Sequence, residues 1–198
     1  MKRIGLFGGT FDPPHLGHMM LAEEVRVACG LDEVWFIPAS TPPHKKRPDM
    51  SSIDDRLEMV SLATRSNPFF FVSSIEKDRG GRSYTIDTVK QLKEEHPSVE
   101  FFFIIGGDMV ESLSSWVGID ELVRLITFIG VNRPGAKRSA AYNERVQHVD
   151  FAQVDLSSTA IRERVREGKS IRYMVQDEVA TMIRESGLYG EGTGTSDR

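Results

Sequence analysis

The segment from Gly8 to His18 holds the residues of this chain that are best suited to chemistry on phosphate groups. It reads GGTFDPPHLGH, so that two histidines, His15 and His18, stand three positions apart. Imidazole N–H groups can donate to phosphate oxygens, and a nearby phosphate raises the pKa of a histidine, so either ring could be cationic. The two prolines hold His15 in a turn before a helix, from which it could reach the same phosphates as His18.

A zinc site is the alternative interpretation of the same residues. Asp12, His15 and His18 follow one another at intervals of three positions, a spacing that could hold zinc. The proline pair, however, prevents one continuous helix from presenting all three side chains. The sequence therefore favours phosphate contacts, and we expect no metal ion held by the protein itself.

Segments of strand length and helix length alternate along the chain, and these elements must position the histidines. Apolar runs predict five strands, and the helical spacing of apolar residues predicts helices between them. The strands are expected at 4–7, 34–37, 69–72, 101–105 and 126–131, and the helices at 18–29, from about 52, and at 84–96. Strands without alternation that are separated by helices imply a mostly parallel sheet covered on both faces.

We therefore expect an α/β fold, with one doubly wound, Rossmann-like domain over residues 1–189 and a small helical C-terminal part from about Ser157. Residues 190–198 are expected to form a disordered tail, because they contain Gly, Thr and acidic residues but no apolar anchor. A chain of 198 residues with 39% hydrophobic and 27% charged residues fits a soluble globular domain of ordinary size.

Composition also limits the classes of binding partner and the cellular compartment that we expect. The net charge of -4 argues against a protein that binds nucleic acid with its whole surface. A single cysteine, Cys29, excludes an intramolecular disulfide and favours a reducing compartment, so we expect a cytoplasmic protein. No apolar run approaches the length of a membrane span, and we expect no membrane partner. The sequence leaves the oligomeric state open, a homo-oligomer included.

Two glycine pairs mark the place where a nucleotide could bind. Gly8-Gly9 and Gly106-Gly107 end the first and fourth predicted strands, and an aspartate, Asp12 or Asp108, follows each pair. In the usual order of a doubly wound sheet these strands are neighbours, and ligands bind beyond their carboxyl ends. Glycine lets a backbone approach a ligand closely, and a helix start offers N–H groups to an anion. Tight turns are the alternative reason for either glycine pair alone.

Two other classes of nucleotide-binding protein are disfavoured by the glycine spacing. A dehydrogenase would carry the fingerprint Gly-x-Gly-x-x-Gly, whereas this chain reads GLFGGT at residues 5–10, which does not fit that spacing. The glycine-rich phosphate loop of P-loop kinases is also absent from the sequence.

The histidine segment resembles the hallmark of the nucleotidylyltransferase superfamily, a His-x-Gly-His at the entry to the first helix. Further motifs stand in the order seen in bacterial nicotinate-nucleotide adenylyltransferases, and the likeness extends from residue 3 to about residue 189. These motifs are PPHK at 42–45, SYTIDT at 83–88, IIGGD at 104–108, Trp116, RPG at 133–135 and SSTAIR at 157–162. One mild departure is Leu156, which stands where isoleucine is common.

The resemblance implies that the adenylyl group of ATP passes to nicotinate mononucleotide, with magnesium carried mainly by the triphosphate. Because both reactants are anions, the protein mainly positions them and neutralises charge. His15, His18 and Arg162 would be the catalytic residues. The expected ATP-binding residues are Gly8, Gly9, Thr10, Phe11, His15, His18, Gly106, Asp108, Arg133, Ser157, Ser158, Thr159 and Arg162.

Particular roles follow within the expected ATP site. The segment from Ser157 to Arg162 would cradle the β- and γ-phosphates, since hydroxyls and N–H groups at a helix start suit phosphates. An ordinary helix cap is the alternative for its hydroxyl side chains. Asp108 would accept hydrogen bonds from the ribose, and the Arg133 loop would border the adenine.

Five residues are expected to bind nicotinate mononucleotide. His44 and Lys45 follow the second strand and could bind its phosphate, and Trp116 could stack on the pyridine ring. Tyr84 and Thr85 stand at a predicted helix start, whose positive dipole end suits a carboxylate better than a neutral amide. This favours nicotinate over nicotinamide. A solvated basic loop and core packing are the alternatives for these residues.

Other functions stay open. Adenylyltransferases for nicotinamide mononucleotide or phosphopantetheine act on other phosphate acceptors. The phosphopantetheine enzymes and cytidylyltransferases share the His-x-Gly-His but lack the combination of Ser-Tyr-Thr with Trp116. A non-catalytic nucleotide-binding regulator on the same fold is a second class, which loss of a motif histidine would suggest. Both histidines are present.

Overall fold

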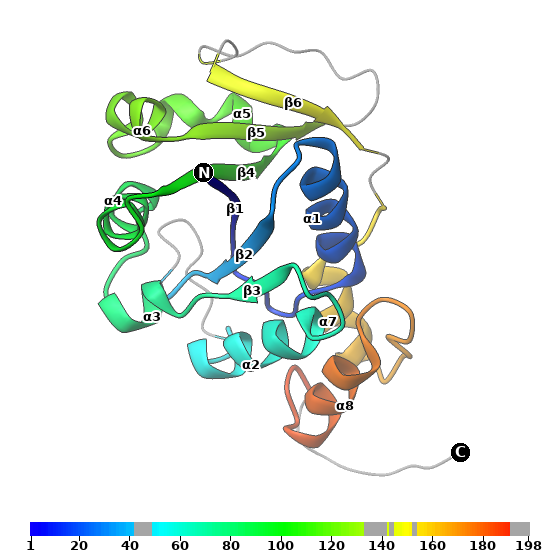
Figure 1. The fold of residues 1–198 in the computed structure, drawn as a ribbon. Coiled ribbons are helices and arrows are strands. Elements are labelled where there is room, and N and C mark those ends of the chain that lie inside the picture. The colour runs from blue at the N-terminus through cyan, green and yellow to red at the C-terminus, as the bar shows by residue number, and fades with distance from the viewer. Residues whose placement is uncertain (42–48, 133–141, 143–144, 152–153, 191–198) are drawn as a thin grey trace.

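The computed structural model describes residues 1–41, 49–132, 142, 145–151 and 154–190. Within these residues, six parallel strands form one sheet in the order β3-β2-β1-β4-β5-β6 (Figure 1). The strands are β1 Lys2–Gly9, β2 Glu33–Pro38, β3 Phe70–Val72, β4 Val99–Gly106, β5 Thr127–Asn132 and β6 Val146–Asp150. The direction of winding reverses between β1 and β4, which are neighbours. The predicted doubly wound α/β fold is therefore confirmed.

Helices cover both faces of the sheet (Figure 1). One layer consists of α1 Leu16–Ala28, α2 Ile53–Thr64, α7 Ser158–Arg166 and α8 Asp177–Glu185. The other consists of α3 Ile75–Arg79, α4 Thr85–Glu95, α5 Gly107–Glu111, a 3-10 turn at Leu113–Ser115 and α6 Ile119–Leu125. Because side chains alternate along a strand, β4 places Phe102 and Ile104 in the first core and Phe101 and Phe103 in the second. The carboxyl ends of β1 and β4 are thus held from both sides.

The five predicted strands are all present, with small differences at their ends. The sequence pattern did not predict β6, because VQHVD is short and half polar, and its pairing with β5 puts it at the sheet edge, where Gln147 and Asp150 are exposed. The predicted C-terminal helical part is confirmed by α7 and α8. The predicted tail lies outside the described residues apart from Gly190, and a single domain over 1–189 stays a prediction.

The predicted start of the first helix is wrong by two residues. α1 begins at Leu16 and not at His18, with His15 in the extended N-cap position. The backbone N–H of Leu16 donates to the carbonyl of Met174 at 2.9 Å. One first-turn N–H group is therefore already used by the C-terminal part of the chain, and the expectation that this helix start presents unpaired N–H groups to a ligand fails at Leu16.

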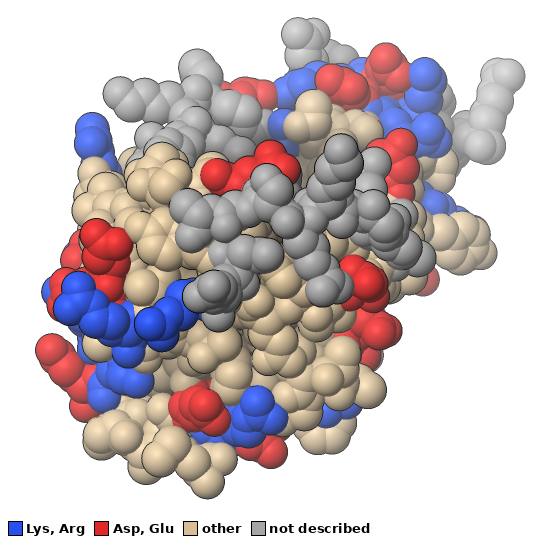
Figure 2. Space-filling model, turned by 90° about the horizontal axis from the view of Figure 1, so that it is seen from above, with Lys and Arg blue, Asp and Glu red and all other residues tan. Residues whose placement is uncertain are grey.

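Charged side chains of both signs are interspersed on the face shown in Figure 2. Small groups of Lys and Arg adjoin Asp and Glu there, and the described residues form no continuous basic stripe on that face. In the part of the chain that the structure describes, no helix is both long enough and apolar enough to cross a membrane.

Candidate active site

The two motif histidines form one unit at the start of α1. The backbone N–H of His15 donates to Nδ1 of His18 at 3.2 Å, and the two rings stack with centroids 3.6 Å apart. In a neutral imidazole, an Nδ1 that accepts a hydrogen bond leaves the hydrogen on Nε2. His18 therefore caps the helix with one ring nitrogen and carries a donor on the other.

Close packing fixes both rings. A Cβ atom at Gly17 would lie 3.1 Å from Nδ1 of His15, so a side chain there would press on the imidazole. The ring of Phe11 meets His18 edge-on with centroids 5.1 Å apart, and Phe7 does so at 5.9 Å. The glycine of the His-x-Gly-His motif thus makes room for His15, while the aromatic residues at the end of β1 hold His18.

His15 is the more deeply buried histidine, with 7% of its surface exposed. Burial lowers its pKa from 6.5 to about 4, so that it is neutral at neutral pH in the absence of a ligand. Its Nδ1 is buried and has no hydrogen-bond partner among the described residues. A bound phosphate would supply both a partner and a reason for the pKa to rise.

This buried histidine predicts a loss of stability in acid. Because the unfolded chain binds the proton between pH 6.5 and about 4 and the folded chain does not, stability present above pH 6.5 falls as the pH drops through this window. The contribution is at most about 3 kcal/mol. We expect the free energy of unfolding of the wild type to fall more steeply with acid than that of His15→Gln. Parallel pH curves from urea unfolding would contradict the expectation.

The start of α7 lies against the turn that precedes His15. Ser158 Oγ donates to the carbonyl of Pro13 at 2.8 Å, and Nη1 of Arg162 donates to the carbonyl of Asp12 at 2.7 Å. Nη2 of Arg162 donates to Thr159 Oγ1 at 3.2 Å. The structure therefore brings together the histidine segment and the predicted triphosphate segment, which are about 150 positions apart in the sequence.

Ser157 has the local role that an ordinary helix cap would give it. Its hydroxyl accepts from the backbone N–H of Ala160 at 3.2 Å, while its own surface is exposed. Thr159 is exposed as well, whereas Arg162 is 7% exposed and donates to the carbonyl of Asp12 and to the hydroxyl of Thr159. Capping and phosphate binding do not exclude one another, because a capped helix start still offers N–H groups to an anion.

The glycines at the strand ends have packing reasons of their own. A Cβ atom at Gly9 would lie 2.8 Å from the ring of Phe11, and one at Gly8 would lie 3.2 Å from Phe103. Gly106 ends β4 and is the N-cap of α5, beside the end of β1. The three glycines stand at the carboxyl ends of the neighbouring strands β1 and β4, and aromatic packing accounts for two of them without a ligand.

Arg56 is a positioning residue of the site that the sequence analysis missed. It is 1% exposed, and its guanidinium donates to the carbonyls of Thr10, Ala39, Ser40 and Ser51 at 2.7–3.3 Å. It thereby ties the segments that follow β1 and β2 to each other. A signal exists in the sequence, since Arg56 shares the apolar face of α2 with Met59 and Val60.

Three of the residues predicted to bind nicotinate mononucleotide are described by the structure, and they lie on the face of the sheet opposite to α1 and α7. Tyr84 is the N-cap of α4 and Thr85 its first residue. Ser83 Oγ accepts from the backbone N–H of Ser40 at 2.9 Å, which ties this helix start to the segment after β2. Trp116 is partly buried and meets Phe103 and Phe128 edge-on, and both Tyr84 and Trp116 pack against the second core.

Four predicted site residues cannot be placed. His44, Lys45 and Arg133 lie outside the described residues, and so does the side chain of Asp108. Their predicted roles stay predictions.

No metal cluster is present in the described part of the chain: no three residues among its His, Cys, Asp and Glu are placed to share an ion. The residues of the zinc alternative are engaged elsewhere. Asp12 is buried and accepts the hydroxyl of Tyr189 at 2.7 Å, while the rings of His15 and His18 stack on each other.

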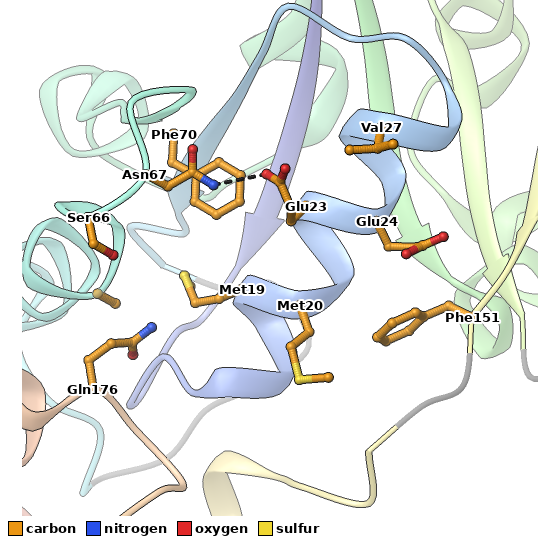
Figure 3. A pocket seen from close by; sticks show the side chains of 11 residues that line it. Met19, Met20, Glu23, Glu24, Val27, Ser66, Asn67, Phe70, Phe151 and Gln176 are labelled. Carbon is orange, nitrogen blue, oxygen red and sulfur yellow. Dashed lines mark hydrogen bonds between the residues drawn. The ribbon is translucent and has the colours of Figure 1, made fainter.

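A cavity of about 510 Å³ lies apart from these residues, along the outer side of α1 (Figure 3). Side chains of α1, the end of α2 and the segment before α8 line it, among them Met20, Glu23, Asn67 and Gln176. Glu23 in its wall accepts from Asn67 and from Arg26. None of the predicted site residues borders this cavity, so it is not the crevice in which the sequence places the nucleotide.

Comparisons with known proteins agree with this fold. The model of the cytidylyltransferase-like family matches residues 6–164. The structure is similar to that of a nicotinic acid mononucleotide adenylyltransferase from Plasmodium falciparum, solved with NaAD, at a TM-score of 0.80 and 20% identity over 96% of this chain and 98% of that chain. The chain belongs to the cytidylyltransferase-like family of nucleotidyltransferases.

Named relatives identify a narrower group within this family. It is 48% identical to the nicotinate-nucleotide adenylyltransferase of Bacillus subtilis (strain 168), over 96% of this chain and 99% of that one. It is 56% identical to the probable nicotinate-nucleotide adenylyltransferase of Shouchella clausii (strain KSM-K16), over 96% and 98% of the two chains. Within the wider family the chain belongs to the nicotinate-nucleotide adenylyltransferases.

Proposed function

We propose that this chain transfers the adenylyl group of ATP to nicotinate mononucleotide, with release of pyrophosphate, and that His15, His18 and Arg162 act on the phosphates. One observation supports these residue roles above all: Ser158 and Arg162 at the start of α7 contact the turn that carries His15 and His18. Family membership supports the reaction, since the relative from Bacillus subtilis is named for it.

The reaction is a displacement at phosphorus. A phosphate oxygen of the mononucleotide attacks the α-phosphorus of ATP, and the bond from that phosphorus to the bridging oxygen breaks. Pyrophosphate leaves with the electron pair, so no covalent bond to the protein is required. Negative charge gathers on the α-phosphate oxygens and on the leaving group in the transition state. Donors that are already fixed near these oxygens lower the barrier, because they need no reorganisation.

The histidine unit is suited to this task. The Nε2 donor of His18 is directed by the hydrogen bond at Nδ1 and by the packing of Phe11 and His15. His15 is neutral before substrate binds and has an unpartnered Nδ1 among the described residues, so a phosphate that meets it would favour its protonation. The charge of Arg162 and the N–H groups at the start of α7 would stabilise the β- and γ-phosphates.

Magnesium would arrive with the triphosphate. Among the described residues, Asp12 of the histidine segment already accepts the hydroxyl of Tyr189. When bound, magnesium neutralises part of the phosphate charge.

The acceptor would bind on the side of α4. In the first turn of α4 the backbone N–H of Asp87 donates to the carbonyl of Tyr84 at 3.1 Å. The N–H groups of Thr85 and Ile86 have no acceptor within the helix because of their position, and the positive dipole end favours a carboxylate. No side chain caps this helix start. Trp116 is held edge-on by Phe103 and Phe128 and stays partly exposed, which supports the proposal that it stacks on the pyridine ring.

Pyrophosphate release is the measurement that tests this function. The protein, ATP and magnesium are combined with nicotinate mononucleotide or nicotinamide mononucleotide at equal concentration, with a mixture lacking acceptor as background. We expect strong preference for the nicotinate form. Equal use of both would remove the carboxylate role of the Tyr84-Thr85 turn but keep the enzyme class. No release with either would contradict the proposed function, and phosphopantetheine would then be tried as acceptor.

A further inference from the structure

The end of the described chain reaches back to the turn that carries the histidines. Tyr189 lies just beyond α8, and its hydroxyl donates to Oδ1 of Asp12 at 2.7 Å, across 177 positions of sequence. The hydroxyl also lies 3.7 Å from Sδ of Met59 on α2. Burial, together with the Asp12 carboxylate, raises the pKa of Tyr189 well above its ordinary value, so the hydroxyl remains protonated at any ordinary assay pH.

Asp12 is held at two points by the C-terminal part of the chain. It is 1% exposed, so its carboxylate is removed from solvent and depends on hydrogen bonds within the protein. Its side chain accepts from Tyr189, and its carbonyl accepts from Arg162 at 2.7 Å. The next carbonyl, that of Pro13, accepts from Ser158. The hydroxyl of Tyr189 thus belongs to a set of contacts that all fix the same turn.

A displacement of Asp12 would be transmitted almost fully to His15 and His18. Pro13 and Pro14 each have a ring-fixed φ torsion, so few soft torsions separate Asp12 from His15. His15 then passes the displacement to His18, because its N–H bonds to Nδ1 and the two rings stack. In a reaction that depends on positioning, a shift of about 1 Å can lower the rate by about a hundredfold.

We propose that Tyr189 is a positioning residue for adenylyl transfer, which holds Asp12 and thereby the turn that carries His15 and His18. The inference rests on the proposed function. It assigns a role to a residue that lies outside every motif of the site and 177 positions from the turn that it holds.

Tyr189→Phe in the full chain tests the proposal, because it removes the hydroxyl and keeps the ring. Tyr173→Phe is the matched control, since Tyr173 is 79% exposed. We expect Tyr189→Phe to lower kcat about tenfold or more with KM for both substrates nearly unchanged, since positioning and not binding is lost. The control should match the wild type. Wild-type activity is measured first, so that a failure of the proposed function is recognised before any variant is compared.

A second comparison separates positioning from simple support of the fold. If Tyr189 acts through Asp12, adding Tyr189→Phe to Asp12→Ala should lower kcat no further than Asp12→Ala alone. Thermal unfolding of each variant shows that the assays are run on folded protein. The proposal is overturned if Tyr189→Phe lowers Tm but leaves kcat within twofold of the wild type. It is equally overturned if the two substitutions lower kcat independently.

Discussion

His18→Asn is expected to lower kcat by about a hundredfold or more, the usual cost of removing a donor aimed at developing charge. The Asn side-chain oxygen can occupy the position of Nδ1 and accept the N–H of His15, as His18 does at 3.2 Å. It cannot reach the position of Nε2. The cap of α1 is therefore kept while the donor to phosphate is lost, and we expect Tm to change little. Steady-state kinetics and thermal unfolding measure the two effects.

His18→Gln is the matched counterpart, because its amide nitrogen can reach the position of Nε2 while the cap is lost. We expect it to retain more of kcat than His18→Asn and to lose more stability, with a missing cap worth about 1 kcal/mol. An active His18→Asn protein would remove His18 from the chemistry. The reverse ranking of the two variants would mean that capping, and not donation, is what His18 provides.

Features that depend on a few neighbouring residues could be read from the sequence. Buried strands appear as apolar runs. Ser52 and Ser157 cap their helices, as is usual for a serine that directly precedes a segment with helical apolar spacing. The neighbouring position of β1 and β4, where the winding reverses, also followed, since the winding rules of such sheets are general. For the site, the sequence supplied the histidines and the α7 segment, which the structure places side by side.

Features that depend on distant contacts could not be read in this way. Nothing near Tyr189 indicates that its hydroxyl reaches Asp12, because that contact requires α8 to be packed on the first core. The same holds for Leu16, the first residue of α1, whose N–H donates to the carbonyl of Met174 in the C-terminal part of the chain. Arg56 gave a local signal, but its acceptors lie on two loops that only the folded sheet brings together.

Arg162→Lys is expected to lower both kcat and Tm, in contrast to His18→Asn. Arg162 is 7% exposed, and its planar guanidinium donates to the carbonyl of Asp12 and to Thr159 at once. A lysine keeps the charge but is a point donor that cannot reproduce the fork. A buried acceptor left without its donor costs about 1–3 kcal/mol. We expect kcat to fall about tenfold or more, because the substitution removes the guanidinium proposed to contact the phosphates and also disturbs the turn that carries the histidines.

Arg166→Lys is the control on the same helix, since Arg166 is exposed and pairs with Asp49 at the surface. It should leave kcat and Tm close to those of the wild type, because exposed ion pairs contribute little. The comparison decides what Arg162 does. If Arg162→Lys lowers Tm but not kcat, the guanidinium only ties α7 to the turn. If kcat falls well beyond the effect of Tyr189→Phe, which disturbs the same turn, the additional loss is the contribution of Arg162 to the phosphates themselves.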